Sequence, residues 1–357
     1  MNCLYCFNSQ VTKNYDLKMS EETLRHIFEI TIPNYPEVNF IWHGGEPLSM
    51  GLPFYQKVVK LQAELNSCGT RIKNSIQSNM TMLTEEFASF LKENGFTISG
   101  SFDGTQNQVT RGNSERILIG IRNAREKIGN CGVISVVSTK NIDHLIEDYE
   151  WFKSQKIGYS LNPYISKDPK DELTVPARRF VERFQELFDY WLTDTTCDIN
   201  LRYFRNFIEH ILLNKRTVCT FNSCLGKWMA IRYNGDIYPC NRDYPEEYSF
   251  GNVMQYDNIR EAFDSPGFIR LTTEAVERRN KCKSCPIYGF CNGGCNHNAL
   301  MYGGVQNNHN YWCDTLIPMY EYIEEKLREL VVLPIDEVKD HYNPYVVKAL
   351  VDRKMVK

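Results

Sequence analysis

Residues 38–48 read VNFIWHGGEPL, a short run of β-branched and aromatic residues that ends in a glycine pair, an acid and a proline. Such a run is typical of a β-strand, and the glycines predict a turn directly after it. Glycine lets a ligand approach the backbone closely, and Glu46 offers a carboxylate to an ammonium group. Taken alone, GGEP could equally be a simple turn, so its meaning depends on the surrounding pattern.

Strand-like runs and amphipathic helix patterns alternate around this stretch, up to about residue 165. The expected strands are 38–42, 72–78, 97–102, 133–138 and 159–165, and the expected helices are 20–31, 53–66, 84–93, 115–128 and 142–155. This alternation predicts a parallel α/β sheet, either an open stack or a barrel. In both architectures the chemistry lies at the carboxyl ends of the strands.

Small polar residues follow the next two expected strands at the corresponding place. They are residues 77–79 (QSN) and 101–104 (SFDG). Each group alone is a weak signal. Three polar strand ends in series predict one functional rim, and the C-x2-C pair of Cys3 and Cys6 in MNCLYCFN precedes them.

Composition excludes two classes of partner. Lys and Arg number 41 against 44 Asp and Glu, a net charge of −3, so no basic field attracts nucleic acid. No run approaches the roughly eighteen apolar residues of a membrane span, and no leader resembles a signal peptide. The 357 residues predict one large domain and a smaller one.

Thirteen cysteines are the strongest compositional signal. An odd count without a leader argues against a disulfide framework and favours metal ligation in a reducing, cytoplasmic setting. Eight cysteines lie within a hundred residues: Cys219, Cys224, Cys240, Cys282, Cys285, Cys291, Cys295 and Cys313. Eight thiolates at unequal spacing favour two four-cysteine iron–sulfur clusters, and a structural zinc ribbon is the alternative. We expect Cys68, Cys131 and Cys197 to be small buried hydrophobic residues.

The cysteine-rich region, residues 219–315, is rich in loops and lacks the apolar periodicity of a stable hydrophobic core. We therefore expect it to need a bound metal or another cross-link for stability. Helices are expected at 175–193 before it and at 314–330 after it. We therefore expect domains at 1–195 and 196–330. We assign no function to the C-terminal tail, residues 331–357.

With these motifs in place, the sequence resembles the radical S-adenosylmethionine (SAM) enzymes, and within them the group with a SPASM domain. MNCLYC matches the last six positions of the family's cluster motif C-N-x-x-C-x-Y-C, and GGEPL matches its SAM-ammonium loop. The spacing C-x2-C-x5-C-x3-C at 282–295, with Cys313 beyond, is the SPASM signature. By this likeness the motif's first cysteine would precede Met1 by two residues, and the chain would begin inside the motif.

The resemblance implies a partial (β/α)6 TIM-type barrel lacking its first strand, followed by an iron–sulfur SPASM domain. It implies three [4Fe–4S] clusters, with Cys3 and Cys6 on the radical cluster. Auxiliary cluster I would use Cys219, Cys224, Cys240 and Cys295, and auxiliary cluster II would use Cys282, Cys285, Cys291 and Cys313. The implied SAM contacts are Tyr5, Gly44, Gly45, Glu46, Pro47, Ser78, Asn79, Ser101, Asp103 and Arg111.

One departure concerns the proton acceptor. Anaerobic sulfatase-maturating enzymes, the pattern most similar to this one, carry a basic aspartate after the cysteine of Y-P-C. Here that position is Asn241, which cannot take a proton. Asp243, two residues on, is a candidate replacement.

Three functions therefore stay open. The first is hydrogen abstraction from a ribosomal peptide during its maturation, with formation of a thioether or carbon–carbon crosslink. The second is sulfatase maturation, which converts cysteine or serine to formylglycine. The third is a non-catalytic cluster or zinc scaffold. The resemblance implies a peptide or protein substrate, a flavodoxin- or ferredoxin-type reductant and a monomer.

Overall fold

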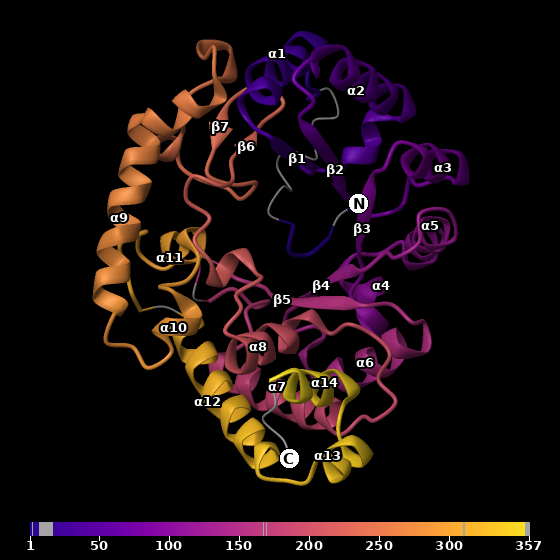
Figure 1. The fold of residues 1–357 in the computed structure, drawn as a ribbon, viewed down its shortest axis with the longest axis vertical. Coiled ribbons are helices and arrows are strands. Elements are labelled where there is room, and N and C mark those ends of the chain that lie inside the picture. Colours follow the sequence, from indigo (N-terminus) through magenta and orange to yellow (C-terminus); the bar gives the residue numbers. More distant parts are fainter. Residues whose placement is uncertain (2, 7–16, 167, 169, 310, 354–357) are drawn as a thin grey trace. The chain divides into compact units, whose positions relative to one another are not determined.

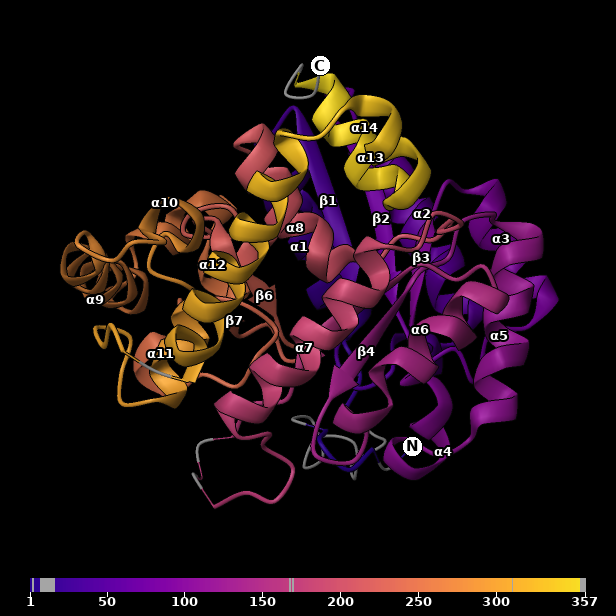
Figure 2. The same ribbon diagram turned by 90° about the horizontal axis from the view of Figure 1, so that it is seen from below.

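The computed structural model describes residues 1, 3–6, 17–166, 168, 170–309 and 311–353 (Figures 1 and 2). Asn2 of the first motif and the last four residues of the tail lie outside the described residues. The chain divides into two interleaved units. Unit 1 comprises Met1–Phe102, Arg111–Cys131 and Cys224–Glu274, and unit 2 comprises Asp103–Thr110, Gly132–Ser223 and Ala275–Lys357. The expected domain boundaries at 195 and 330 stay a prediction.

The predicted parallel sheet is confirmed. Its strands are β1 (Glu37–Trp42), β2 (Arg71–Gln77), β3 (Thr97–Ser101), β4 (Val133–Val137) and β5 (Tyr159–Pro163), in that order. In unit 1, β1 pairs with β2 from Glu37↔Arg71 to Trp42↔Ile76, and β2 pairs with β3. In unit 2, β4 pairs with β5 from Val133↔Tyr159 to Val137↔Pro163. These parallel strands agree with the partial barrel that the family resemblance implies.

Every expected helix of the α/β region is present, and each buries an apolar stripe; two of them, α1 and α3, also have a side-chain N-cap. Ser20 caps α1 by accepting from the Thr23 amide, and Thr84 caps α3 by accepting from Phe87. The helices of this region are α1 (Glu21–Thr31), α2 (Leu52–Leu65), α3 (Glu85–Glu93), α4 (Asn107–Thr110), α5 (Ser114–Lys127) and α6 (Leu145–Ser154). In both views α2, α3 and α5 lie on the same side of β1–β3 (Figures 1 and 2).

The remaining elements follow β5. The helices are α7 (Ala177–Leu192), α8 (Arg202–Leu213), α9 (Pro266–Cys282), α10 (Tyr288–Cys291), α11 (Asn296–Met301), α12 (Tyr311–Val331), α13 (Ile335–His341) and α14 (Pro344–Asp352). A small antiparallel pair, β6 (Ala230–Ile231) and β7 (Ile237–Tyr238), belongs to unit 1. Among the described residues, no helix is long and apolar enough to span a bilayer.

The cysteine-rich region contains one long helix, α9, that its sequence hides. This helix carries many charges, so its apolar periodicity is weak, and i,i+4 pairs such as Arg270–Glu274 and Glu277–Lys281 support it instead. Of the three remaining cysteines, Cys131 is buried as expected, and burial raises the pKa of its thiol to about 12. The expectation is wrong for Cys68, which is exposed, and Cys197 is half-buried.

The core of unit 1 is built around Tyr55 of α2, which is fully buried. Its ring contacts Trp42 of β1, Phe87 of α3 and Phe96, with ring centroids 5.4–5.9 Å apart. Its hydroxyl donates to the carbonyl of Pro47 at 3.1 Å. The aromatic core therefore fixes the loop that follows β1.

Candidate functional site

The loop after β1 presents Gly44, Gly45 and Glu46 at the carboxyl end of the strand. Gly44 has φ +110°, a conformation that disfavours residues with a side chain, and a Cβ added there would meet no atom within 4 Å. Pro47 then begins the short helix η3 (Pro47–Met50). Backbone conformation therefore requires glycine at this position, and the open space beside it fits a ligand that approaches the backbone.

Glu46 joins the ends of β1 and β2. Its carboxylate accepts from the Ser78 hydroxyl at 2.8 Å, the Asn79 amide at 2.8 Å and the Leu48 amide at 3.0 Å. Burial raises the pKa of Glu46, and these three donors oppose that rise. The predicted contact between this carboxylate and an ammonium group stays a prediction.

The ends of β2 and β3 are joined in the same way. The Gln77 amide donates to the carbonyl of Gly100 at 2.8 Å and to the hydroxyl of Ser101 at 3.1 Å, and it accepts from Ser99 at 2.6 Å. The predicted rim is thus present in unit 1. We call Gly44, Gly45, Glu46, Ser78, Asn79 and Ser101 the strand-end site.

Cys3 and Cys6 form the turn expected of a C-x2-C pair, since the Cys6 amide donates to the Cys3 carbonyl at 3.2 Å. The guanidinium of Arg111 lies 3.9 Å from the Cys3 sulfur and 5.3 Å from the centroid of the Tyr5 ring. The structure therefore brings together four residues of the predicted cluster and SAM sets. A guanidinium beside a sulfur favours its thiolate form, which is the form that binds metal.

Asp103 lies elsewhere, in the interior of unit 2. One carboxylate oxygen accepts from the Val136 amide at 2.9 Å and the other from the Thr110 hydroxyl at 2.7 Å, and the residue is fully buried. These bonds anchor α4 to β4. The predicted role of Asp103 in SAM binding stays a prediction.

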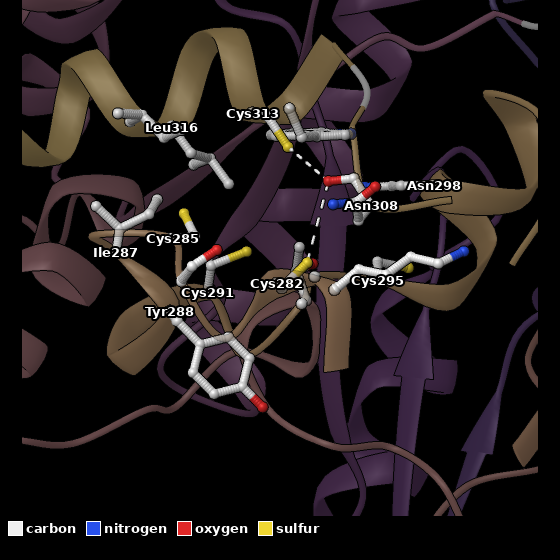
Figure 3. A pocket seen from close by; sticks show the side chains of 17 residues that line it. Cys282, Cys285, Ile287, Tyr288, Cys291, Cys295, Asn298, Asn308, Cys313 and Leu316 are labelled. Carbon is white, nitrogen blue, oxygen red and sulfur yellow. Dashed lines mark hydrogen bonds between the residues drawn. The ribbon is translucent and has the colours of Figure 1, made fainter. Parts of the chain in front are cut away.

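Five predicted ligands of unit 2 line one cavity of about 160 Å³ (Figure 3). They are Cys282, Cys285, Cys291, Cys295 and Cys313. The other lining side chains are both apolar, such as Ile287, Trp312 and Leu316, and polar, such as Asn298 and Asn308. We call this space the cysteine cavity.

Backbone turns orient the cysteine side chains toward the cysteine cavity. The Cys285 amide donates to the Cys282 carbonyl at 2.9 Å, and the Gly294 amide donates to the Cys291 carbonyl at 2.9 Å. The thiol of Cys313 donates to the carbonyl of Asn308 at 3.4 Å. Figure 3 shows the sulfurs of Cys282, Cys285, Cys291 and Cys313 around the same space.

The cavity opposes the ionisation of its own thiols. Burial, together with the neighbouring Cys313, Cys282 and Cys285, raises the pKa of Cys291 to about 12. Burial also raises the pKa of Cys282. A bound metal relieves this cost, because it binds the thiolate directly.

The donor set fits an iron–sulfur cluster. Within the described part of the chain, no three His, Cys, Asp or Glu side chains converge closely enough to hold a single metal ion. The thiols instead surround a volume, and the cysteines of a cubane cluster bind separate iron atoms. The cavity is therefore better matched to a cluster than to the zinc ion of the alternative hypothesis.

The predicted ligands of auxiliary cluster I are divided between the units. Cys219, at the start of η6 (Cys219–Phe221), and Cys295 belong to unit 2, whereas Cys224 and Cys240 belong to unit 1. Their convergence on one cluster stays a prediction.

One charged side chain, Arg278, contacts the backbone of the cysteine loops, and no sequence motif marks it. Arg278 of α9 is fully buried and donates to the carbonyls of Gly293 (2.7 Å) and Gly294 (3.3 Å), to that of Val305 and to the Asn296 side chain at 2.6 Å. Its positive charge also opposes the rise in the pKa of Cys282 and Cys291.

Asn241 and Asp243, the two candidates at the family's base position, have different surroundings. The Asn241 amide nitrogen lies 3.3 Å from Nδ1 and 3.2 Å from Nε2 of His43. Asp243 has a side chain 77% exposed and lies 3.8 Å from the guanidinium of Arg232. His43 is a residue that sequence reasoning passed over, and the available signal was its position directly before GGEP.

Two family profiles match this chain. The profile of the radical SAM superfamily matches residues 1–152, and that of SPASM, an iron–sulfur cluster-binding domain, matches residues 219–286. The chain is 25% identical over 349 residues to the cysteine-type anaerobic sulfatase-maturating enzyme of Clostridium perfringens, which covers 92% of this chain and 94% of that protein.

Solved structures share the fold. Native anSMEcpe with bound AdoMet has a TM-score of 0.83 at 23% identity, and native anSMEcpe with bound AdoMet and Kp18Cys peptide has a TM-score of 0.78 at 24% identity. Each match covers 92% of this chain and 94% of the other. Both profile matches fall on the regions where the sequence analysis found its motifs.

Proposed function

The chain belongs to the radical SAM superfamily and carries a SPASM domain, and from this premise we propose that it oxidises a side chain of a peptide or protein in the manner of the anaerobic sulfatase-maturating enzymes. The observation that carries the proposal is the similarity over 92% of the chain to a protein whose solved structure holds both AdoMet and a peptide. This comparison supports sulfatase-type maturation, the second of the three functions, better than ribosomal-peptide maturation, the first.

SAM and [4Fe–4S] clusters, including a SPASM auxiliary cluster, are the cofactors of this class. Bound SAM supplies hydrogen-atom abstraction through its reductive cleavage. In this chain Cys3 and Cys6 would hold the radical cluster, and Arg111 lies beside the Cys3 sulfur. The strand-end site would orient SAM through Glu46 and the open backbone at Gly44.

The four cysteines of auxiliary cluster II would hold a second cluster, which supplies a one-electron acceptor for the oxidation. Ile287, Trp312 and Leu316 would shield part of this cluster from solvent, since they line the same cavity. We propose a third cluster on Cys219, Cys224, Cys240 and Cys295, by the family resemblance.

Ribosomal-peptide maturation is the second candidate, and one observation favours it. Asn241 occupies the position of the sulfatase maturases' aspartate, and its amide cannot take a proton. A crosslinking reaction does not require that aspartate. Asp243, the substitute base that the sequence suggests, has a side chain 77% exposed.

The test uses the full-length gene product, anaerobically reconstituted with iron and sulfide and incubated with SAM and dithionite. One arm contains a sulfatase-type peptide whose cysteine carries deuterium at Cβ. We expect deuterium in 5′-deoxyadenosine and a new aldehyde on the peptide. Deuterium transfer only from a peptide encoded beside its gene, with a crosslinked product, supports the second candidate. No transfer from either peptide contradicts the proposal.

A further inference from the structure

His43 ends β1 and begins the glycine loop, so it lies three residues before Glu46 of the strand-end site. Its Nδ1 atom accepts from the Gly44 amide at 2.8 Å, which holds the ring in the loop. The Asn241 amide lies 3.2 Å from Nε2 and 3.3 Å from Nδ1. A titratable ring therefore occupies the space between the predicted SAM loop and the family's base position, all within unit 1.

The proposed oxidation requires a proton acceptor at this place. Loss of a hydrogen atom from Cβ leaves a carbon radical beside a thiol or hydroxyl group. Completing the two-electron oxidation then removes one electron and the S–H or O–H proton. Asn241 has no basic atom for that proton, and the carboxylate of Asp243 faces solvent and Arg232.

We propose that His43 is the catalytic proton acceptor of this chain, in place of the aspartate found in sulfatase maturases. The inference rests on the proposed function. In the step, hydrogen goes from Cβ to C5′ of the nucleoside, one electron goes to an oxidant of the iron–sulfur class, and the thiol or hydroxyl proton goes to His43. A C=S or C=O double bond forms at the substrate carbon, which balances the atoms and electrons.

The surroundings keep the ring in the form that can accept a proton. Burial lowers the pKa of His43, although part of the ring remains accessible, and the nearby charge of Arg242 lowers it further. The contact with the Gly44 amide acts in the opposite direction. A lowered pKa favours the neutral imidazole, in which Nδ1 carries the lone pair. The substrate proton therefore goes to Nδ1 and replaces the Gly44 N–H as its partner.

Three variants separate a base from a structural residue. His43→Gln removes the proton acceptor, and the double variant His43→Gln/Asn241→Asp restores a carboxylate at the family position. His26→Gln is the control, because His26 is a half-buried histidine of the same unit whose ring contacts the Val253 and Tyr256 carbonyls. The assay measures product formed per 5′-deoxyadenosine with the deuterated cysteine peptide.

We expect His43→Gln to keep deuterium transfer but to lower product per 5′-deoxyadenosine by about 10²–10⁴-fold. The double variant recovers much of that loss, and His26→Gln changes little. A structural role for His43 predicts no recovery by Asn241→Asp. Full product from His43→Gln overturns the inference alone, whereas no deuterium transfer in the wild type overturns the proposed function and this inference together.

A measurement on the protein without cofactors provides a second readout. Histidine resonances followed by NMR against pH should give His43 a pKa below the usual 6.5 or so. Asn241→Asp should raise that pKa, because a carboxylate beside the ring stabilises the imidazolium. A pKa above the usual value, unmoved by Asn241→Asp, contradicts the inference.

Discussion

The strand-end site of unit 1 and the cysteine cavity of unit 2 differ in what holds their side chains in place. Glu46 already accepts three hydrogen bonds from its own chain, and Tyr55 supports the loop behind it. The cavity instead gathers five cysteines, and burial there raises the pKa of Cys282 and Cys291. Protein hydrogen bonds therefore organise the first region before any ligand binds, whereas the second depends on the group that it holds.

The largest effect that tests this contrast comes from removing iron. We expect amide hydrogen exchange over residues 282–313 to accelerate by more than about 100-fold in the chelated protein, because metal binding supplies folding free energy to such regions. Exchange over β1, β2 and β3 should stay unchanged. Equal protection of residues 282–313 with and without iron would show that the cysteine cavity is stable without bound metal.

Next in size is the loss of the buried guanidinium. Arg278→Met leaves two buried and two partly buried acceptors without their donor. Each buried one is worth about 1–3 kcal/mol, so thermal unfolding should move to clearly lower temperature. Arg270→Met is the matched control on the same helix, since its exposed pair with Glu274 is worth at most about 1 kcal/mol. Similar decreases in unfolding temperature for the two variants would show that Arg278 does not specifically stabilise the cysteine cavity.

A smaller and local effect is expected at the strand-end site. Glu46→Gln removes the charge predicted to face the SAM ammonium and replaces an acceptor of three bonds with a weaker one. We expect SAM affinity, measured by calorimetry on the reconstituted protein, to fall by about 10–100-fold, with little change in iron content. Glu37→Gln, an exposed acid at the start of β1, is the control. Unchanged affinity would place the ammonium elsewhere.

The smallest effect concerns the support behind the glycine loop. Tyr55→Phe removes only the hydroxyl that donates to Pro47, which costs about 1 kcal/mol of stability. SAM affinity should change by less than tenfold, because the other contacts of Glu46 remain. A larger loss of affinity would mean that this single bond organises the whole loop.

The same contrast explains what the sequence could predict. Strands, capped helices and C-x2-C turns are local, so β1–β5, α1–α3 and the turn at Cys282 follow from patterns of a few residues. Arg278 and the Asn241–His43 contact depend on residues far apart in sequence, and no short pattern marks them. Helix α9 escaped prediction because its buried apolar face, with Leu271 and Ala275, is narrow and charged residues occupy much of the helix.

Burial of single cysteines was predictable only as an average tendency. Cys131 follows that tendency and Cys68 does not, since each depends on the elements that happen to pack over it. Four cavity cysteines belong to the auxiliary cluster II set that the family resemblance implies, whereas Cys295, implied for auxiliary cluster I, lines the same cavity.

The most direct test of the central claim, that this chain cleaves SAM to oxidise a peptide side chain, is 5′-deoxyadenosine formation by the reconstituted full-length protein with dithionite. The account predicts nucleoside that depends on SAM and iron and that disappears when Cys3 and Cys6 are both replaced by alanine. Zinc in place of iron, or nucleoside formed equally by the alanine variant, would contradict it.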